Sequence, residues 1–328
     1  MHDQAPEADP RLSESPALSG ITVPSGPVDP SLADPTATGG GAWRQLRVAA
    51  RALGSLLLGG LAIVGPILVF RQGLLPLIDA IFQPGPAGLS AIRRAGILLA
   101  AIGGYLAYVR WHEKRPATEL RLQPIRLLLG GASGALLVAV PIALLFAVGA
   151  YELVLYRAVS PALSGVAVLI GVAATLEELI YRCLLFRVLE RAWGTGMALA
   201  VQAVVFAVGH LENLEHGGAA PVATMLLSVT VLGLLWAGVF VLTRNLWVTA
   251  AHHAAWNFTI LSSGVPLSGI EDWRALAPLE TRYAGPDWLT GGIFGPESSV
   301  LVIASTTAAV VLLLRAARRH GAFRAPTA

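Results

Sequence analysis

The chain has 328 residues, of which 55% are hydrophobic and 13% are charged, and its formal net charge is +3. Its mean hydropathy is +0.66, and no soluble domain needs that much apolar surface. These values exclude a soluble globular protein, so a lipid bilayer is the expected environment and no nucleic-acid partner is expected.

Residues 1–42 mix Pro, Gly, Ser, Asp and Ala without an apolar period. Such a segment cannot bury enough surface to offset the entropy of ordering, so we predict a disordered N-terminal tail. It lacks a basic head followed by an apolar core, which argues against a cleavable signal sequence. The first membrane span is therefore expected to act as the targeting signal.

Eight apolar stretches approach the roughly 20 helical residues that cross a bilayer core. The alternating pattern of a membrane barrel strand is absent, and helices otherwise satisfy every backbone group in lipid. The predicted fold is therefore all-α, a polytopic integral membrane protein with about eight transmembrane helices. Their expected positions are residues 53–70, 95–109, 127–150, 161–181, 197–210, 221–242, 246–264 and 299–314.

The placement of Lys and Arg indicates the orientation, because cytoplasmic loops retain positive residues near the ends of spans. With the N-terminus inside, most of these residues fall on the cytoplasmic side, notably in residues 44–51, 110–126 and 315–324. Several Trp side chains fall at the same predicted boundary: Trp43, Trp111, Trp193 and Trp247. We expect both termini in the cytoplasm and a location in a bacterial cytoplasmic membrane.

The first polar cluster within a predicted span is Glu177, Glu178 and Arg182. An ionisable side chain in a membrane segment is costly and usually faces a polar cavity where it acts. Residues four apart share a helix face, so Glu178 and Arg182 can pair while Glu177, about 100° round the axis, remains free. A structural ion-pair network between helices is the alternative interpretation.

Two further clusters lie in other spans. Phe206 and His210 are one helical turn apart, and so are His253 and Asn257. Imidazole suits proton transfer or metal binding, and an imidazole with an amide can donate to a developing oxyanion. Taken singly, each cluster is explained as well by hydrogen bonding at a helix end or between helices.

The three clusters together, Glu-Glu-x-x-x-Arg, Phe-x-x-x-His and His-x-x-x-Asn, resemble the CPBP intramembrane protease family. That family includes the CAAX prenyl endopeptidases and bacterial proteins associated with bacteriocin processing and immunity. The resemblance spans about residues 160–264. It divides the chain into a tail (1–42), N-terminal transmembrane helices (43–159), a catalytic helical core (160–264) and a C-terminal part (265–328). The last part is expected to hold an outer loop that caps the bundle, the final span and a basic tail.

The resemblance implies an endopeptidase in which Glu177 and His210 activate a water molecule for attack on a peptide carbonyl. It implies that His253 and Asn257 hold the oxyanion, with Phe206 beside His210 and Arg182 fixing Glu178 in support. The implied partner is a membrane-associated peptide or a lipidated protein, of the CAAX type or with a leader peptide. His252, beside His253, leaves open which imidazole acts.

A metal mechanism competes with glutamate catalysis. Glu177, His210 and His253 are a normal ligand set for Zn²⁺, with a fourth position open for water. The HExxH helix of many zinc proteases is absent, so the sequence leaves the cofactor open while favouring a metal-free reaction.

Three other functions remain open at this point. Intramembrane Glu and His residues also serve as proton relays in transporters, although no inverted repeat is visible here. A non-proteolytic scaffold or immunity protein could keep the same fold and bind a membrane partner. A protein that binds a phospholipid or lipid anchor without cleavage is the third alternative.

Overall fold

The structure is a computed structural model that describes residues 37–214 and 218–327. The predicted tail therefore lies outside the described residues up to residue 36, and helix α1 begins at Ala37. The chain divides into two compact units, Met1–Arg44 and Gln45–Ala328. The described residues of the first unit, 37–44, are helical, and the arrangement below concerns the second unit.

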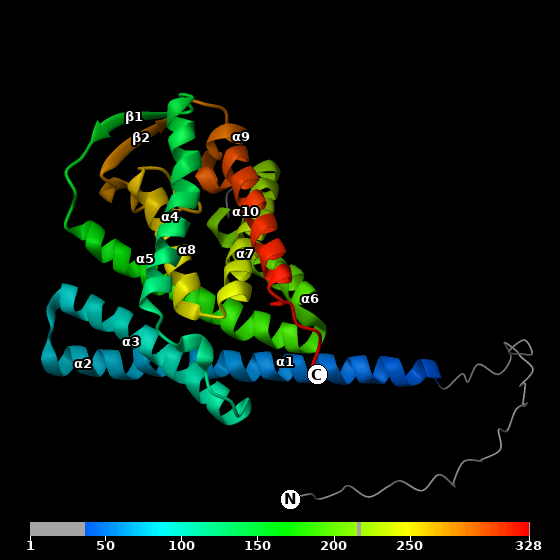
Figure 1. Ribbon diagram of the computed structural model, residues 1–328. Helices are drawn as coiled ribbons and strands as arrows, with labels where there is room; N and C mark the ends of the chain where they lie inside the picture. The colour runs from blue at the N-terminus through cyan, green and yellow to red at the C-terminus, as the bar shows by residue number, and fades with distance from the viewer. Residues whose placement is uncertain (1–36, 215–217, 328) are drawn as a thin grey trace, which may run out of the picture. The chain divides into compact units, whose positions relative to one another are not determined.

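Helices form most of the described chain (Figure 1). They are α1 (Ala37–Val69), α2 (Leu75–Phe82), α3 (Gly85–Ala107), α4 (Pro124–Ala147), α5 (Ala162–Glu178), α6 (Arg187–Val208), α7 (Ala219–Thr243), α8 (Leu246–Ser262), α9 (Asp287–Thr290) and α10 (Val300–Arg319). The two strands are β1 (Tyr151–Tyr156) and β2 (Leu279–Tyr283). The predicted all-α, polytopic membrane fold is confirmed, with this small sheet added to it.

Within the described residues, 6 helical segments are long and apolar enough to cross a membrane. All eight predicted spans overlap a helix, and the difference in number has two causes. Helices α5 and α6 and the π-helical residues Leu179–Phe186 between them count as one segment of 52 residues, although its backbone is not helical at Gly194. Helix α8 has 17 residues, just short of a full crossing. The chain is an integral membrane protein.

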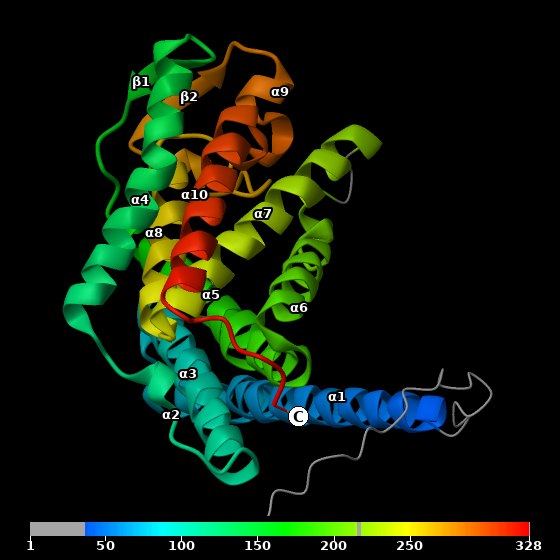
Figure 2. The same cartoon turned by 45° about the vertical axis from the view of Figure 1, so that its right-hand side comes forward.

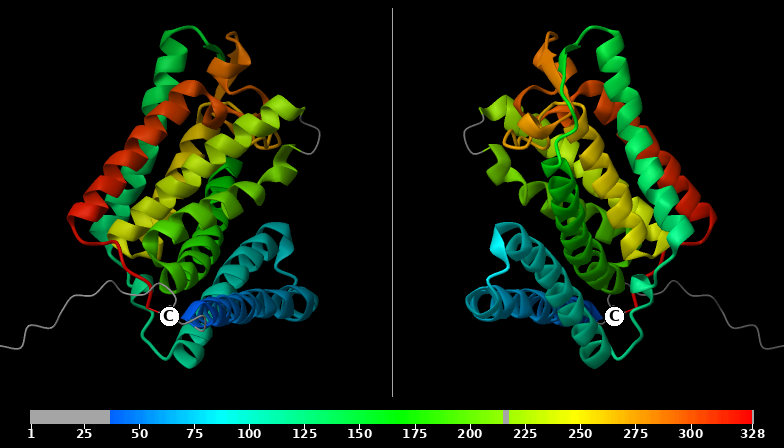
Figure 3. Two further views of the ribbon diagram at one scale, coloured as in Figure 1. Left: turned by 90° about the vertical axis from the view of Figure 1, so that its right-hand side faces the viewer. Right: turned by 90° about the vertical axis from the view of Figure 1, so that its left-hand side faces the viewer.

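Helix α8 is central to the bundle because it packs against α4, α5 and α7. Figures 2 and 3 show α4, α8 and α10 running side by side. Glycines allow the closest of these approaches. A Cβ atom added at Gly130 would lie 2.8 Å from the carbonyl oxygen of Val248, and one at Gly134 would collide with the backbone of His252. The backbones of α4 and α8 are therefore in direct contact.

The two strands lie together with α9 at one end of the bundle (Figure 3). They pair antiparallel, with Tyr151 opposite Tyr283. The rings of this pair stack with centroids 4.9 Å apart, and the Tyr151 hydroxyl donates to the carbonyl of Thr290 at 2.6 Å. The sheet thereby ties the α4–α5 connection to residues 264–298, which we call the capping segment.

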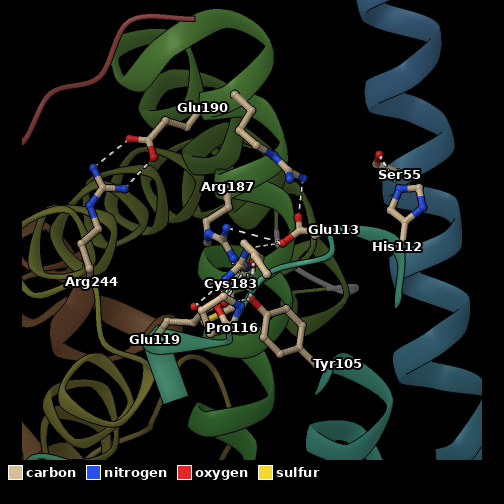
Figure 4. Close-up of polar contacts among 12 residues, drawn as sticks. Ser55, Tyr105, His112, Glu113, Pro116, Glu119, Cys183, Arg187, Glu190 and Arg244 are labelled. Carbon is tan, nitrogen blue, oxygen red and sulfur yellow. Dashed lines mark hydrogen bonds and ion pairs between the residues drawn. The ribbon is translucent and has the colours of Figure 1, made fainter. Parts of the chain in front are cut away.

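An ion-pair network joins the α3–α4 connection to α6 (Figure 4). Glu113 and Glu119 are its buried carboxylates; Glu119 lies 2.7 Å from Arg187 and 2.8 Å from Arg115, and Glu113 pairs with Arg191. Every carboxylate in the network has a cationic partner, as burial requires. The network therefore has a structural explanation.

Candidate active site

A cavity of about 100 Å³ lies between α5, α6, α7, α8 and the capping segment. The four residues predicted to be catalytic all line it: Glu177, His210, His253 and Asn257. A cavity of this volume holds several water molecules, since one occupies about 30 Å³ in the liquid. The structure thus brings side chains from three sequence clusters to one polar space inside an apolar bundle.

The two adjacent glutamates occupy different environments at the end of α5. The Glu177 side chain faces the cavity and is 34% exposed, whereas that of Glu178 is fully buried. The Arg182 guanidinium nitrogen Nε lies 3.1 Å from Glu178 Oε2. Helix α5 gives way to the π-helical turn directly after Glu178, and such turns are frequent at functional sites.

Arg182 is also fully buried, and its charge is compensated on several sides. Besides Glu178, its Nη2 donates to the carbonyl of Gly233 at 3.2 Å, and its guanidinium lies 4.6 Å from the centre of the Phe206 ring. A guanidinium at this distance is attracted to an aromatic face. Arg182 therefore holds Glu178 in place, and its guanidinium packs over the ring of Phe206.

His210 follows the end of α6, where its orientation is fixed by the backbone. Its Nδ1 lies 2.8 Å from the carbonyl oxygen of Phe206. A carbonyl oxygen only accepts hydrogen bonds, so Nδ1 carries a proton and Nε2 is the ring nitrogen left for chemistry. The Phe206 ring lies beside the imidazole, with centroids 4.5 Å apart.

His253 projects from α8 between the two glutamates. Its Nδ1 lies 2.8 Å from Glu178 Oε1 and its Nε2 lies 3.9 Å from Glu177 Oε2. Asn257, one turn further along α8, also lines the cavity, and its side-chain oxygen is buried without a hydrogen-bond partner among the described residues. An unpaired buried amide facing a polar cavity is available to a ligand.

The structure separates the two adjacent histidines. His253 lines the cavity, whereas His252 is absent from its walls and its backbone faces Gly134 of α4. His252 is buried, 4% exposed, and its Nδ1 has no partner in the part of the chain that the structure describes. We therefore take the imidazole of His253, and not that of His252, as the candidate for the site.

Several residues of the site escaped the sequence analysis. Trp236 of α7 lines the cavity, as do Ser268 and Glu297 of the capping segment. Trp236 is one of two aromatic residues in a strongly apolar helix, and Glu297 is one of five acids in the capping segment, which is rich in Gly and Pro. Neither position carries a spacing that indicates a site, so no sequence pattern could have found them.

The donors around the cavity do not fit a shared metal ion. Within residues 37–214 and 218–327, no three His, Cys, Asp or Glu side chains stand close enough to hold one. We therefore derive no step of the reaction through a metal.

Comparison with known proteins gives one match. Residues 158–259 match the family model described as Type II CAAX prenyl endopeptidase Rce1-like. A search of curated proteins and a search of solved structures each found no match. The matched segment contains Glu177, His210, His253 and Asn257, and it supports a CPBP family protease, a hydrolase of peptide bonds.

Proposed function

From the match of residues 158–259 to the Rce1-like endopeptidases, we propose that this membrane protein hydrolyses a peptide bond within the bilayer. The observation that carries the proposal is the shared cavity, which places Glu177, His210, His253 and Asn257 around a space for water. Four polar side chains around one cavity are costly in an apolar bundle, and a role in hydrolysis accounts for their presence there.

Glu177 and His210 are the proposed activating groups. The Glu177 carboxylate takes a proton from the water molecule. At the same time the oxygen of that water forms a bond to the peptide carbonyl carbon. His210, whose Nε2 has no hydrogen-bond partner within residues 37–214 and 218–327, assists through the same water. The proton then passes to the peptide nitrogen as the carbon–nitrogen bond breaks, so one water molecule yields a carboxylic acid and an amine. Positioned acid–base groups of this kind contribute about 10²–10⁴-fold to a rate.

His253 and Asn257 are the proposed oxyanion donors. To donate from Nε2, His253 must carry a proton on that nitrogen. A second proton must then lie in the hydrogen bond between its Nδ1 and Oε1 of Glu178. Arg182 balances the charge of Glu178 on its other side. Each well-placed oxyanion donor contributes about 3–4 kcal/mol to the stability of the transition state.

The proposed substrates are membrane-associated peptides, either lipidated proteins of the CAAX type or proteins with a leader peptide. A site inside the helical bundle suits a substrate that the bilayer itself presents. We also propose that both termini are cytoplasmic and that the membrane is the bacterial cytoplasmic membrane, because the Lys and Arg residues favour that orientation.

The proposal is tested by comparing new peptide termini, by mass spectrometry, in cells that contain the wild-type protein or Glu177→Gln at matched membrane levels. Termini that disappear with the variant establish proteolysis through this carboxylate and identify the cleaved sequence. Identical termini in both strains would overturn the proposal and would favour a non-proteolytic scaffold.

A further inference from the structure

Glu297 is a buried acid in the wall of the catalytic cavity, and it lies outside the segment that matches the protease family. It belongs to the short 3₁₀ turn Pro296–Ser298 that precedes α10, and it is 2% exposed. A buried carboxylate is costly unless hydrogen bonds replace its lost hydration. Its partners therefore indicate what it does.

The Glu297 carboxylate joins α8 to the capping segment. Its Oε1 accepts from the indole Nε1 of Trp256 at 3.3 Å, and its Oε2 accepts from the hydroxyl of Ser268 at 2.6 Å. Trp256 is fully buried in α8, between His253 and Asn257 in the sequence. The carboxylate thus holds the helical turn that carries both proposed oxyanion donors.

Trp256 is linked to His253 through a second indole. Its ring meets that of Trp236 edge to face, with centroids 6.5 Å apart, and Trp236 in turn stacks on His253. Aromatic contacts of this geometry are directional. A displacement of Trp256 is therefore transmitted to the imidazole of His253.

The capping segment is also tied to the turn after His210. The carbonyl of Ser268 accepts from the side-chain amide of Asn213 at 3.0 Å. Ser268 itself has a φ of 50°, a conformation that non-glycine residues seldom adopt without support. Gly295, with a φ of 99°, makes a close contact with the carbonyl of Pro266 that a side chain would prevent. The two ends of the capping segment are thereby held together beside the cavity.

We propose that Glu297 is a positioning residue of the active site, which holds Trp256 and Ser268 so that His253, Asn257 and the capping segment keep their places around the water. The inference rests on the proposed protease function and adds to it a requirement for a residue outside the matched segment. Glu297 acts here as a hydrogen-bond acceptor, so a glutamine in its place keeps the bond to Trp256.

Two readouts on the full-length protein test this proposal. The first is hydrolysis of a quenched-fluorescent farnesylated peptide of the CAAX type by protein in liposomes, which gives kcat and KM. The second is the ¹⁵N–¹H signal of the Trp256 indole in detergent micelles, assigned by its loss in Trp256→Phe. The variants are Glu297→Ala, Glu297→Gln and Ser268→Ala, with Glu271→Gln as the matched control because that side chain is 58% exposed in the same segment.

We expect Glu297→Ala to lower kcat by about tenfold to hundredfold while KM changes little, since small misplacements of catalytic groups have effects of this size. Glu297→Gln should retain most of the activity, and Glu271→Gln all of it. The Trp256 signal should shift in Glu297→Ala and stay in place in the control. An unchanged kcat in folded Glu297→Ala would overturn the proposal, as would a Glu297→Gln variant as inactive as the alanine variant.

The failure of the proposed function is distinguishable from the failure of this inference. If neither the wild-type protein nor Glu177→Gln releases fluorescence, proteolysis of this peptide is excluded, and the indole signal alone decides the role of Glu297. A Trp256 signal that stays in place in Glu297→Ala would then overturn the positioning role. A signal that shifts would support it.

Discussion

The imidazole of His253 is stacked on the indole of Trp236, with ring centroids 3.6 Å apart and planes inclined by 18°. Trp236 comes from α7 and is 2% exposed, while Glu178 of α5 binds the Nδ1 atom of the same imidazole. The ring is thus held on its face and on one edge. This leaves a single orientation, in which Nε2 is directed toward Glu177.

Replacement of Trp236 should loosen this histidine. We expect Trp236→Leu to lower kcat about tenfold and to lose about 0.5–1.5 kcal/mol of stability beyond the effect of lost burial, the usual worth of an aromatic pair. Peptide hydrolysis and thermal unfolding in detergent measure the two effects. Trp288→Leu is the control, because Trp288 is 65% exposed in α9. A fully active Trp236→Leu would show that the stack does not orient His253.

Glu177→Gln should strongly slow hydrolysis without unfolding the protein. The side chain is 34% exposed, and among the described residues its one ion-pair contact is the 3.9 Å approach to Nε2 of His253, so we expect an unchanged Tm. The rate should fall by about 10²–10⁴-fold, the range for loss of an acid–base group. Glu152→Gln on β1, at 44% side-chain exposure, is the control carboxylate. A variant that retains wild-type kcat would remove Glu177 from the reaction.

The two adjacent histidines should respond oppositely to the same change. His252→Leu should keep its activity and its stability, because the replacement removes a buried nitrogen that lacks a partner among the described residues. His253→Leu should be inactive, because the cavity loses a donor. Hydrolysis and Tm measured side by side test the pair. Loss of activity in both variants, at unchanged Tm, would contradict the assignment to His253.

The buried pair of Glu178 and Arg182 predicts strong energetic coupling. Removal of one partner leaves an uncompensated charge, so Arg182→Met should cost about 3–5 kcal/mol of stability. The double variant Glu178→Gln with Arg182→Met should recover part of this loss, since neither buried charge remains. A double-mutant cycle in thermal unfolding measures the coupling. Additive single effects would mean that the pair does not interact.

Glu297 should give stability a characteristic pH dependence. Burial raises its pKa above the ordinary value of 4.5, although hydrogen bonds from Ser268 and Trp256 and the nearby His210 lower it in part. Between the ordinary and the raised pKa the native state binds more protons than the unfolded state, so stability falls as pH rises through this window. The ionisable side chains of Glu177, His210 and His253 face the same cavity as Glu297.

The test is a comparison of Tm for the wild-type protein and Glu297→Gln at several pH values upward from 4.5. We expect the wild-type protein to lose stability relative to the variant as the pH rises. A difference in Tm that does not vary with pH would show that the carboxyl group is not perturbed by burial.

Hydrophobic runs were sufficient to locate the helices, because lipid demands long apolar segments with internally satisfied backbones. The start of α6 was less predictable. The predicted fifth span began at residue 197, whereas α6 begins at Arg187 and is interrupted at Gly194, which has a φ of 81°. The π-helical turn leaves the hydrophobic pattern unchanged, so the pattern did not show that α5 runs on into the first turns of α6. The interruption at Gly194 lies just before the predicted start of the fifth span, so the part of α6 after it matches that prediction.

The polar clusters predicted the composition of the cavity, because charged or amide side chains are costly in an apolar helix and usually face a polar cavity. They could not predict its outer wall. Trp236 and Glu297 are brought to the site by tertiary packing from α7 and from the capping segment, without local spacing. The division of the chain after residues 42, 159 and 264 stays a prediction, and the cavity itself draws on residues beyond 264.

The contact of Gly134 with the backbone of His252 has a mechanical consequence for substrate access. Helix α8 cannot come closer to α4 at this point, because the two backbones already touch, so α4 directly backs the wall that carries His253 and Asn257. If a substrate enters by displacing part of the bundle, we therefore expect the displaced part to be α5, α6 or the capping segment. The proposed oxyanion donors would then keep their places while the walls opposite them open.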